Sequence, residues 1–136
     1  MIERFAQTLK KSHRSMTKPR QRVFEELAKR GPLTTTALAA HCHPDVDRAT
    51  VYRTVDLFER LGIVNRIWQG FKSQVELSEI FTPHHHHAVC QNCGKSIEIV
   101  SPELEAMLSH LAKQHDFLTV GHVIELTGYC RRCQQK

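Results

Sequence analysis

Four cysteines at matched spacing are the residues of this 136-residue sequence with the clearest chemistry. Cys90 and Cys93 form one Cys-x-x-Cys pair, and Cys130 and Cys133 form a second pair close to the C-terminus. A two-residue gap lets both sulfurs of a pair face one metal ion, and four thiolates are the ligand set of a closed tetrahedral zinc site. The alternatives are two redox dithiols or plain buried cysteines. Two matched pairs favour zinc, whose binding would staple a small fold together.

A run of four histidines, His84 to His87, is separated from Cys90 by two residues. The run lies inside the sequence, whereas an expression tag normally lies at a terminus. In an extended chain alternate side chains point to opposite faces, so His84 and His86 would share one face. His85 and His87 would share the other. One run can therefore supply two separate imidazole sites, and imidazole suits zinc, iron, copper or nickel. A solvated polar loop is the alternative, but four histidines beside a thiolate site favour metal binding.

The length of the chain fits one ordinary domain or two small ones. No apolar run approaches membrane-spanning length, and the N-terminal segment has no apolar core of the signal-peptide kind. We therefore expect a cytoplasmic protein with no membrane partner, in which paired and reduced cysteines indicate a metal rather than a disulfide. Cys42, the unpaired fifth cysteine, is expected to be a small buried residue.

Charge is distributed unevenly along the chain. Residues 1–72 contain 14 Lys and Arg against 7 Asp and Glu, a net charge of +7, whereas residues 73–136 contain 5 against 7, a net charge of −2. A basic first half and a ligand-rich second half suggest that polyanion binding and metal binding belong to different domains. The candidate phosphate contacts in the basic half are Lys10, Lys11, Arg14, Lys18, Arg20 and Arg22.

Helical patterns occupy most of the first half. Apolar residues at helical spacing predict a helix over residues 2–12. Thr17, with a proline two residues later, predicts the start of a second helix, which Gly31 ends. A third, short helix is expected from about Thr34 to residues 41–44.

The fourth helix is the best defined, with Asp47 as its cap, Gly62 at its end and apolar residues at helical spacing between them. Its exposed side is basic and aromatic near the N-terminus and more acidic further along. This polarity fits a recognition helix, whose N-terminal residues reach base edges; a solvated amphipathic helix is the alternative. The candidate DNA-binding residues are Lys18 and Arg20 of the second helix and Arg48, Thr50, Tyr52 and Arg53 of the fourth.

Two β-type runs, residues 63–68 and 71–77, follow this helix and are joined by Gln69-Gly70, which predicts a hairpin. Three helices followed by a hairpin make a winged helix-turn-helix, in which one helix enters the major groove. The hairpin therefore favours a recognition helix over a solvated amphipathic helix as the interpretation of the fourth helix. Residues 78–83 are expected to be a linker.

The second half of the chain has a mixed pattern that predicts an α+β fold. Residues 96–100 alternate as a strand, and residues 120–126 form a further apolar run typical of a strand. Between them Pro102 opens a helix. Its apolar residues, expected to face inward, are Leu104, Met107, Leu108 and Leu111.

Three motifs together resemble the ferric uptake regulator family, which are metal-dependent bacterial DNA-binding regulators. They are Thr50-Val51-Tyr52-Arg53, Pro19-Arg20, and HHHHAVCQNCGK followed by a distal Cys-x-x-Cys. The match covers about residues 10–133, with the motifs in family order. It implies a metal-responsive repressor of metal-homeostasis genes that binds double-stranded DNA at A/T-rich inverted repeats as a homodimer.

The resemblance also implies a domain organisation and a set of ligands. Residues 1–77 would form the winged-helix domain, residues 78–83 a hinge, and residues 84–136 a small α/β dimerisation domain. The structural zinc ligands would be Cys90, Cys93, Cys130 and Cys133. The regulatory hinge site resembles a set of Glu76, His85, His87 and Glu98. An additional site inside the dimerisation domain resembles a set of His84, His86, Glu105 and His122.

Two positions depart from the family pattern. Pro32 stands where iron- and peroxide-sensing members usually have a histidine, and Asn65 where zinc-sensing members often have an acidic residue or a histidine. Two imidazoles with carboxylates accept Fe(II), Zn(II) or Mn(II), so the sequence leaves the sensed metal open among these ions, with iron and zinc as the main candidates.

Two other classes of function are alternatives to DNA regulation. A zinc hydrolase would need an open coordination position and a general base, and the sequence has no HExxH motif. A zinc-stabilised module that recruits protein or RNA would not need the hairpin or the Tyr52-Arg53 placement.

Overall fold

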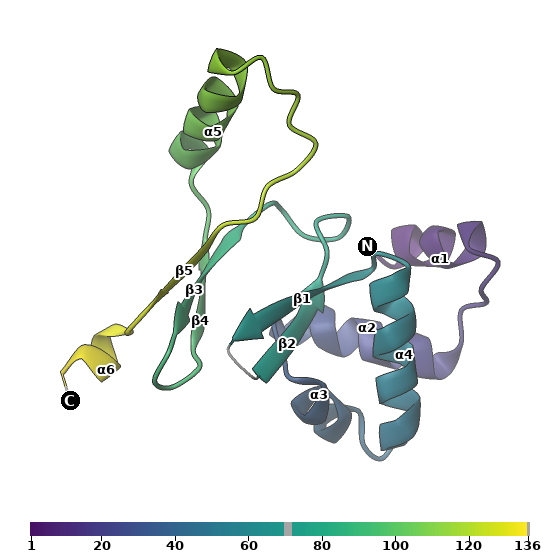
Figure 1. The fold of residues 1–136 in the computed structure, drawn as a ribbon. Coiled ribbons are helices and arrows are strands. Elements are labelled where there is room, and N and C mark those ends of the chain that lie inside the picture. The colour runs from purple at the N-terminus through teal and green to yellow at the C-terminus, as the bar shows by residue number, and fades with distance from the viewer. Residues whose placement is uncertain (70–71, 136) are drawn as a thin grey trace. The chain divides into compact units, whose positions relative to one another are not determined.

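The computed structural model describes residues 1–69 and 72–135 of the chain. The chain divides into two compact units, Met1–Pro83 and His84–Lys136, whose described residues are treated separately below (Figure 1). No helix in the described ranges is both long enough and apolar enough to cross a lipid bilayer.

The first unit contains four helices and one hairpin. In chain order its elements are α1 (Ile2–Lys11), α2 (Lys18–Arg30), α3 (Thr35–Cys42), α4 (Arg48–Arg60), β1 (Val64–Gln69) and β2 (Lys72–Leu77).

Side-chain caps start three of these helices at the residues that the sequence indicates. Thr17, Thr34 and Asp47 each accept a hydrogen bond from a backbone N–H three residues further on, which satisfies one of the unpaired donors of a helix N-terminus. Gly31 and Gly62 follow α2 and α4 with φ angles of 73° and 65°, a conformation that glycine adopts without steric cost. The predicted order of four helices is therefore confirmed.

The hairpin is antiparallel, with its register running from Val64 opposite Leu77 to Gln69 opposite Lys72. Gly70 and Phe71, predicted to form the turn and to begin the second strand, lie outside the described residues. A bridge between Leu33 and Val75, with N···O distances of 3.0 and 2.7 Å, ties the hairpin to the segment before α3.

The core of the first unit is built around phenylalanine rings. Phe5 of α1 stacks on Phe24 of α2 at a centroid distance of 4.1 Å, and Phe58 of α4 meets Phe5 edge-on at 5.4 Å. Phe81 also joins this core, edge-on to Phe24 at 5.1 Å. Ser78 in turn donates a hydrogen bond from Oγ to the carbonyl oxygen of Gly62. Much of the segment expected to be a linker is therefore packed on the first unit.

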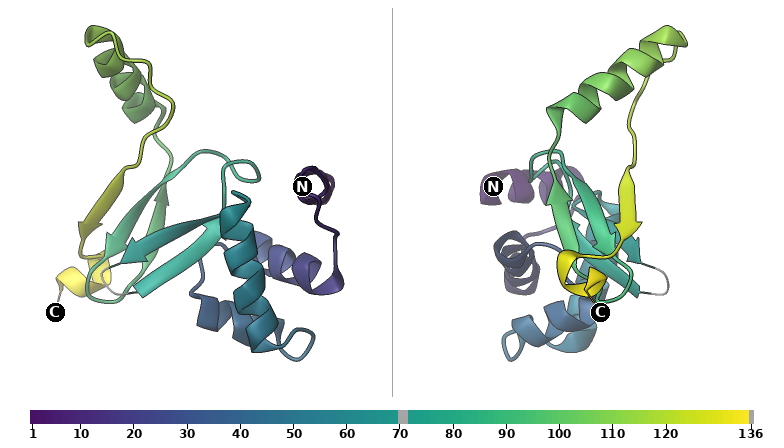
Figure 2. Two further views of the ribbon diagram at one scale, coloured as in Figure 1. Left: turned by 45° about the vertical axis from the view of Figure 1, so that its right-hand side comes forward. Right: turned by 90° about the vertical axis from the view of Figure 1, so that its left-hand side faces the viewer.

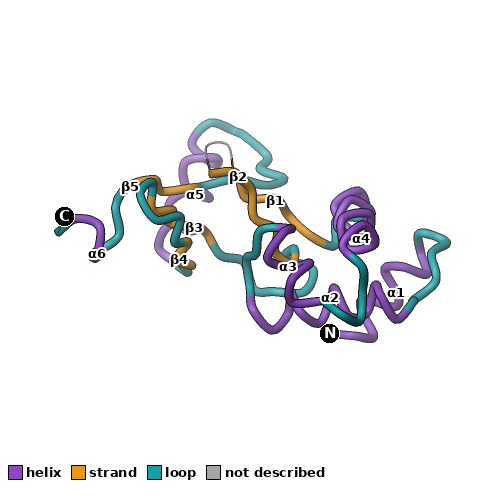
Figure 3. The backbone as a smooth tube through the Cα atoms, turned by 90° about the horizontal axis from the view of Figure 1, so that it is seen from below, coloured by secondary structure: helices purple, strands orange, loops and turns teal. Residues whose placement is uncertain are grey.

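The second unit has a small mixed sheet and two helices. Its elements are β3 (His86–Cys90), β4 (Ser96–Ile99), α5 (Pro102–Gln114), β5 (Glu125–Gly128) and α6 (Arg131–Gln134). The strand order is β4-β3-β5, with β3 antiparallel to β4 and parallel to β5 (Figure 3).

Two expectations for this unit are wrong in detail. The strand predicted over residues 120–126 starts only at Glu125, and the side chains of Val120 and Val123 are 97% and 96% exposed. The apolar side of α5 does not face inward, because none of its residues is buried and Met107 is 61% exposed. Both views of Figure 2 show most of α5 projecting beyond the sheet, and the described part of this unit buries none of its residues.

Candidate metal centres and nucleic-acid interface

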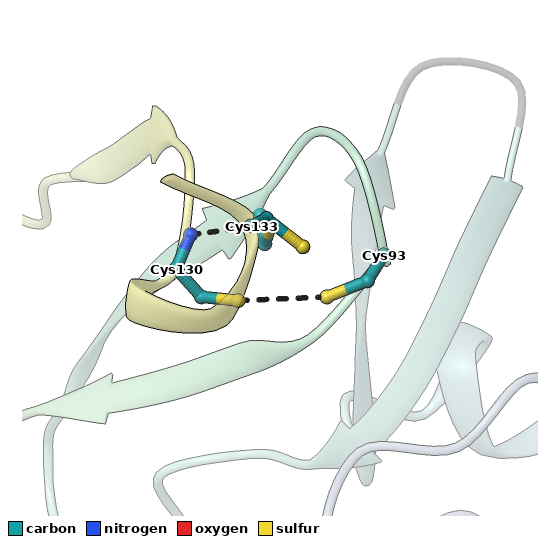
Figure 4. Close-up of side chains that lie close together, drawn as sticks. Cys93, Cys130 and Cys133 are labelled. Carbon is teal, nitrogen blue, oxygen red and sulfur yellow. Dashed lines mark hydrogen bonds between the residues drawn. The ribbon is translucent and has the colours of Figure 1, made fainter. Parts of the chain in front are cut away.

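The four paired cysteines converge at one end of the sheet. Cys90 ends β3, Cys93 lies in the following turn, and the other pair flanks the start of α6. The parallel pairing of β3 with β5 sets Cys90 opposite Gly128, which brings the second pair close to the first. The four Sγ atoms all lie within 4.8 Å of one another. Sγ of Cys93 is 3.7 Å from Sγ of Cys130 (Figure 4). All four are reduced cysteines.

The local electrostatics favour thiolates at part of this cluster. The backbone N–H of Cys130, 3.3 Å from Sγ of Cys90, is the main reason that the pKa of Cys90 falls to about 6. A backbone hydrogen bond from Lys95 likewise lowers the pKa of Cys93. Desolvation raises the pKa of Cys133 to about 11, so this thiol needs a cation to ionise. Four converging sulfurs fit tetrahedral zinc, the metal that such a donor set selects.

A second cluster gathers three imidazoles and one carboxylate on one side of the sheet. Nε2 of His86 is 2.6 Å from Oε1 of Glu105, and Nε2 of His84 is 3.2 Å from the same oxygen. Nε2 of His122 lies 3.3 Å from Oε2 of Glu105 and 3.1 Å from Nε2 of His84. Hydrogen bonding to His86 is the largest cause of the lowered pKa of Glu105. The donor atoms therefore point at a common centre, as ligands of a divalent metal do.

The two remaining histidines lie together as the alternation of an extended chain requires. The ring centroids of His85 and His87 are 4.9 Å apart, and those of His84 and His86 are 4.8 Å apart. Glu98 is exposed and lies opposite His87 in the β3–β4 register, which places both on the same face of the sheet.

Two further residues bear on the regulatory site: Ser96, which was not expected there, and Glu76, which was. Oγ of Ser96 is 3.0 Å from Nδ1 of His87, a contact that the sequence does not signal. Glu76 lies buried in β2 of the first unit, opposite Asn65.

The N-terminal half of α4 presents an ordered polar surface. The hydroxyl of Tyr52 is 2.9 Å from Oγ1 of Thr36 in α3, and the guanidinium of Arg48 lies 5.4 Å from the centre of the Tyr52 ring. Arg53 donates to Oγ1 of Thr50, 3.0 Å away. The side chains expected to contact DNA are therefore held by neighbours before any DNA binds. Sequence reasoning missed Thr36, because its partner lies on a different helix.

One expected phosphate contact has a different role. Arg22 donates to carboxylate oxygens of Glu26 and Asp45 and, at 3.1 Å, to the carbonyl oxygen of His41. Arg30 also donates to Glu26, which is buried. The guanidinium of Arg22 thus ties α2 to the end of α3 and to the turn before α4, and its contact with phosphate stays a prediction. The four-residue spacing of Arg22, Glu26 and Arg30 is the signal that predicts this network.

A helical unit with a two-stranded wing, followed by a unit with a four-thiolate cluster, defines a winged-helix regulator with a metal-stabilised second domain. The model of the ferric uptake regulator family matches residues 11–127, so the chain belongs to that family. Membership makes the protein a metal-responsive transcriptional regulator rather than an enzyme, as the motifs predict.

Individual relatives agree with this assignment. The ferric uptake regulation protein of Campylobacter jejuni is 34% identical over 143 residues, an alignment that covers 100% of this chain and 90% of the relative. The structure of the Vibrio cholerae ferric uptake regulator is similar with a TM-score of 0.76 at 31% identity, covering 91% of this chain and 98% of that one. The Helicobacter pylori regulator shares the fold with a TM-score of 0.85 at 24% identity, covering 99% and 92%.

Proposed function

We propose that the chain is a cytoplasmic homodimeric repressor that binds A/T-rich inverted repeats when a divalent metal occupies a regulatory site. The division of the histidine run into two clusters, by alternation along β3 and the two residues before it, carries the proposal. His84 and His86 complete a four-residue cluster on one face, and His85 and His87 are left as a second pair on the other. A chain that needed only one structural metal would not need two such sets.

The structural metal is zinc held by Cys90, Cys93, Cys130 and Cys133. It supplies a cross-link between the end of β3 and the start of α6, whose ends meet through the sheet. The convergence of four cysteine sulfurs supports this assignment. Zinc ligation needs reduced cysteines, which a cytoplasmic location would provide.

The regulatory ligands are His85 and His87 with Glu98 of the second unit and Glu76 of the first. When bound, the metal supplies a link between ligands of the two units. The Ser96 hydroxyl, 3.0 Å from Nδ1 of His87, can accept a hydrogen bond from that nitrogen, and in that tautomer Nε2 carries the lone pair that a metal ligand needs. His84, His86, Glu105 and His122 form the additional site, which stabilises the second unit.

Dimerisation follows from the apolar surface of the second unit. Leu118, Val120 and Val123 are almost fully exposed, and the sheet has exposed edges at β4 and β5. A second copy of the same unit covers such a surface and pairs such an edge in a closed two-fold assembly. Two recognition helices related by this symmetry match an inverted repeat.

DNA recognition belongs to the first unit. Arg53 reads guanine and Tyr52 lies against a thymine methyl group, while Lys10, Lys11, Arg14, Lys18 and Arg20 neutralise phosphates. Ligand binding across the two units favours the arrangement in which both recognition helices fit successive major grooves. The regulatory ligand set accepts Fe(II), Zn(II) or Mn(II), and titration with each ion separately identifies which one raises operator affinity.

The test compares two histidines one residue apart. Operator binding is measured by fluorescence anisotropy during a metal titration at fixed salt, on the parent, His87→Ala and His86→Ala proteins. His87→Ala should remain a folded, zinc-containing dimer whose operator affinity no longer rises with metal. His86→Ala should chiefly lower dimer stability or the effective metal sensitivity. Metal response retained by His87→Ala but lost by His86→Ala would move regulation into the second unit and contradict the proposal.

A further inference from the structure

Trp68, the single tryptophan of the chain, lies near the end of β1 with 62% of its surface exposed. A large aromatic side chain in water forgoes the stabilisation that burial would give it. The strands β1 and β2 extend away from the helices, so the residue stands on a projecting element (Figure 1). An exposed indole on a projecting hairpin is therefore a candidate contact with a ligand.

The alternation of β1 determines which face carries the indole. Val64, Arg66 and Trp68 are two residues apart, so their side chains share one face of the hairpin. Val64 packs in the core, and Arg66 makes a two-pronged pair with Glu59 of α4 at distances of 2.7 to 3.1 Å. Trp68 thus continues the face that packs against α4, about 6.6 Å beyond Arg66.

Arg66 orients the ring rather than binding a phosphate. Its guanidinium is paired with Glu59, donates to Oγ of Ser73 at 3.2 Å, and lies 6.0 Å from the centre of the Trp68 ring. The carboxylate already neutralises this cation. The wing therefore offers an aromatic surface at this point rather than a free positive charge.

We propose that Trp68 packs on the deoxyribose backbone that borders the major groove entered by α4, an apolar contact that does not select bases. This inference rests on the proposed function. A helix about 10–12 Å across fills a groove about 12 Å wide, so an element packed beside it meets the sugar–phosphate strand at the groove's edge. The net charge of +7 in residues 1–72 draws a polyanion to this unit.

The surroundings of the ring favour DNA over a protein partner. Across the hairpin Trp68 faces Ser73, and its neighbour on the same face is the ion-paired Arg66. A protein interface centres on a contiguous apolar patch, whereas the described residues beside this ring, Arg66 and Ser73, are polar. Deoxyribose offers an apolar face within a charged backbone, which matches an aromatic ring framed by polar side chains.

Fluorescence gives a direct test because the protein has one tryptophan. The emission of the metal-loaded, full-length dimer is recorded before and after addition of operator DNA and of a random duplex. Both duplexes should change the Trp68 emission. Unchanged emission on a protein that binds operator by anisotropy would overturn the inference while leaving the proposed function intact, whereas failure to bind operator at all would reject both.

Three substitutions then separate an aromatic contact from other roles. Trp68→Ala should weaken binding to operator and random DNA alike by roughly three- to tenfold, with the salt dependence unchanged. Trp68→Phe should remain within about twofold of the parent because it keeps an aromatic face. Ile67→Ala, whose side chain points to the opposite face, is the matched control and should bind like the parent.

Two further variants calibrate the readout. Lys18→Ala should lower affinity for all DNA and reduce the salt slope by about one, and Arg53→Ala should lower operator affinity far more than random affinity. A Trp68→Ala protein that matches the Lys18 pattern, matches the Arg53 pattern or binds like the parent contradicts the deoxyribose contact. Equal losses from Ile67→Ala would likewise show that the variants disturb the hairpin as a whole.

Discussion

The two units of this chain are stabilised in different ways. The first unit buries an apolar cluster centred on Phe5, Phe24 and Phe58. Among the described residues of the second unit only four are buried, and two of these are histidines: His86, His87, Val89 and Cys90. Hydrophobic burial can maintain the first unit, whereas the second is expected to depend on metal ligation and on a partner surface. Regulation by metal is therefore expected to act through the unit that lacks a core.

The largest effect should come from breaking the thiolate cluster. Cys93→Ser should release about one zinc per chain and unfold the second unit while the first stays folded, because a structural zinc contributes roughly 10–16 kcal/mol. Metal analysis with limited proteolysis and mass spectrometry checks both parts of this expectation. Cys42→Ala, at a buried cysteine of the first unit, should keep its zinc. Full zinc content in the Cys93 variant would contradict the proposal that zinc bound by these cysteines stabilises the second unit.

The converse experiment removes an aromatic ring from the first unit. Phe24→Ala deletes the contacts with Phe5 and Phe81 and should cost about 3–5 kcal/mol of unfolding free energy. Operator binding should be lost while zinc is retained, as urea unfolding followed by circular dichroism and metal analysis would show. Phe117→Ala, at a 69% exposed ring of the second unit, should leave the urea midpoint of the first unit unchanged. Concurrent zinc loss in the Phe24 variant would mean that the units do not fold independently.

A smaller effect is expected on the pH dependence of the unfolding free energy. It should distinguish Glu26, a buried carboxylate of the first unit, from the exposed Glu25. Hydrogen bonds from Arg30 and Arg22 lower the pKa of Glu26, so its contribution is present above the unfolded-state pKa and is lost as pH falls through the folded-state value. Glu26→Gln should cost about 2 kcal/mol at pH 7, and the difference from the parent should shrink progressively below about pH 5.

Urea unfolding at pH 7, 5 and 3 measures the Glu26 effect. Both proteins lose zinc alike in acid, so their difference isolates the carboxylate. Glu25→Gln, which alters an exposed neighbour bonded to Gln21, should show no comparable pH-dependent gap. A gap between Glu26→Gln and the parent that persists at pH 3 would assign the effect to packing rather than to charge.

Local chemistry explains what could be predicted about the first unit. Thr17, Thr34 and Asp47 cap their helices at the residues indicated by sequence, because a cap needs only an oxygen and a backbone N–H three residues away. Helix ends at Gly31 and Gly62 follow from the positive φ that glycine tolerates. The same reasoning could not find the Tyr52–Thr36 contact, which joins two helices.

Apolar periodicity predicted burial and strand boundaries less accurately in the second unit than in the first. The pattern identified residues of α5 that avoid water, but not what covers them, and Met107 is exposed in the chain. Val120 and Val123 were predicted to lie in a strand for the same reason and precede it instead. Hydrophobicity records the need for burial and does not distinguish a neighbouring layer from a second protomer.

The sequence by itself determined the four-helix order, the hairpin and the donor types, since capping, strand alternation and Cys-x-x-Cys spacing act over a few residues. Only the tertiary structure decided which distant groups meet. Parallel pairing of β3 with β5 brings Cys90 to Cys130, and the position of α5 brings Glu105 to His86. The two pairs are 40 and 19 residues apart in the sequence. They meet because of the strand pairing and the path of the chain around the sheet, and neither can be predicted from a local sequence pattern.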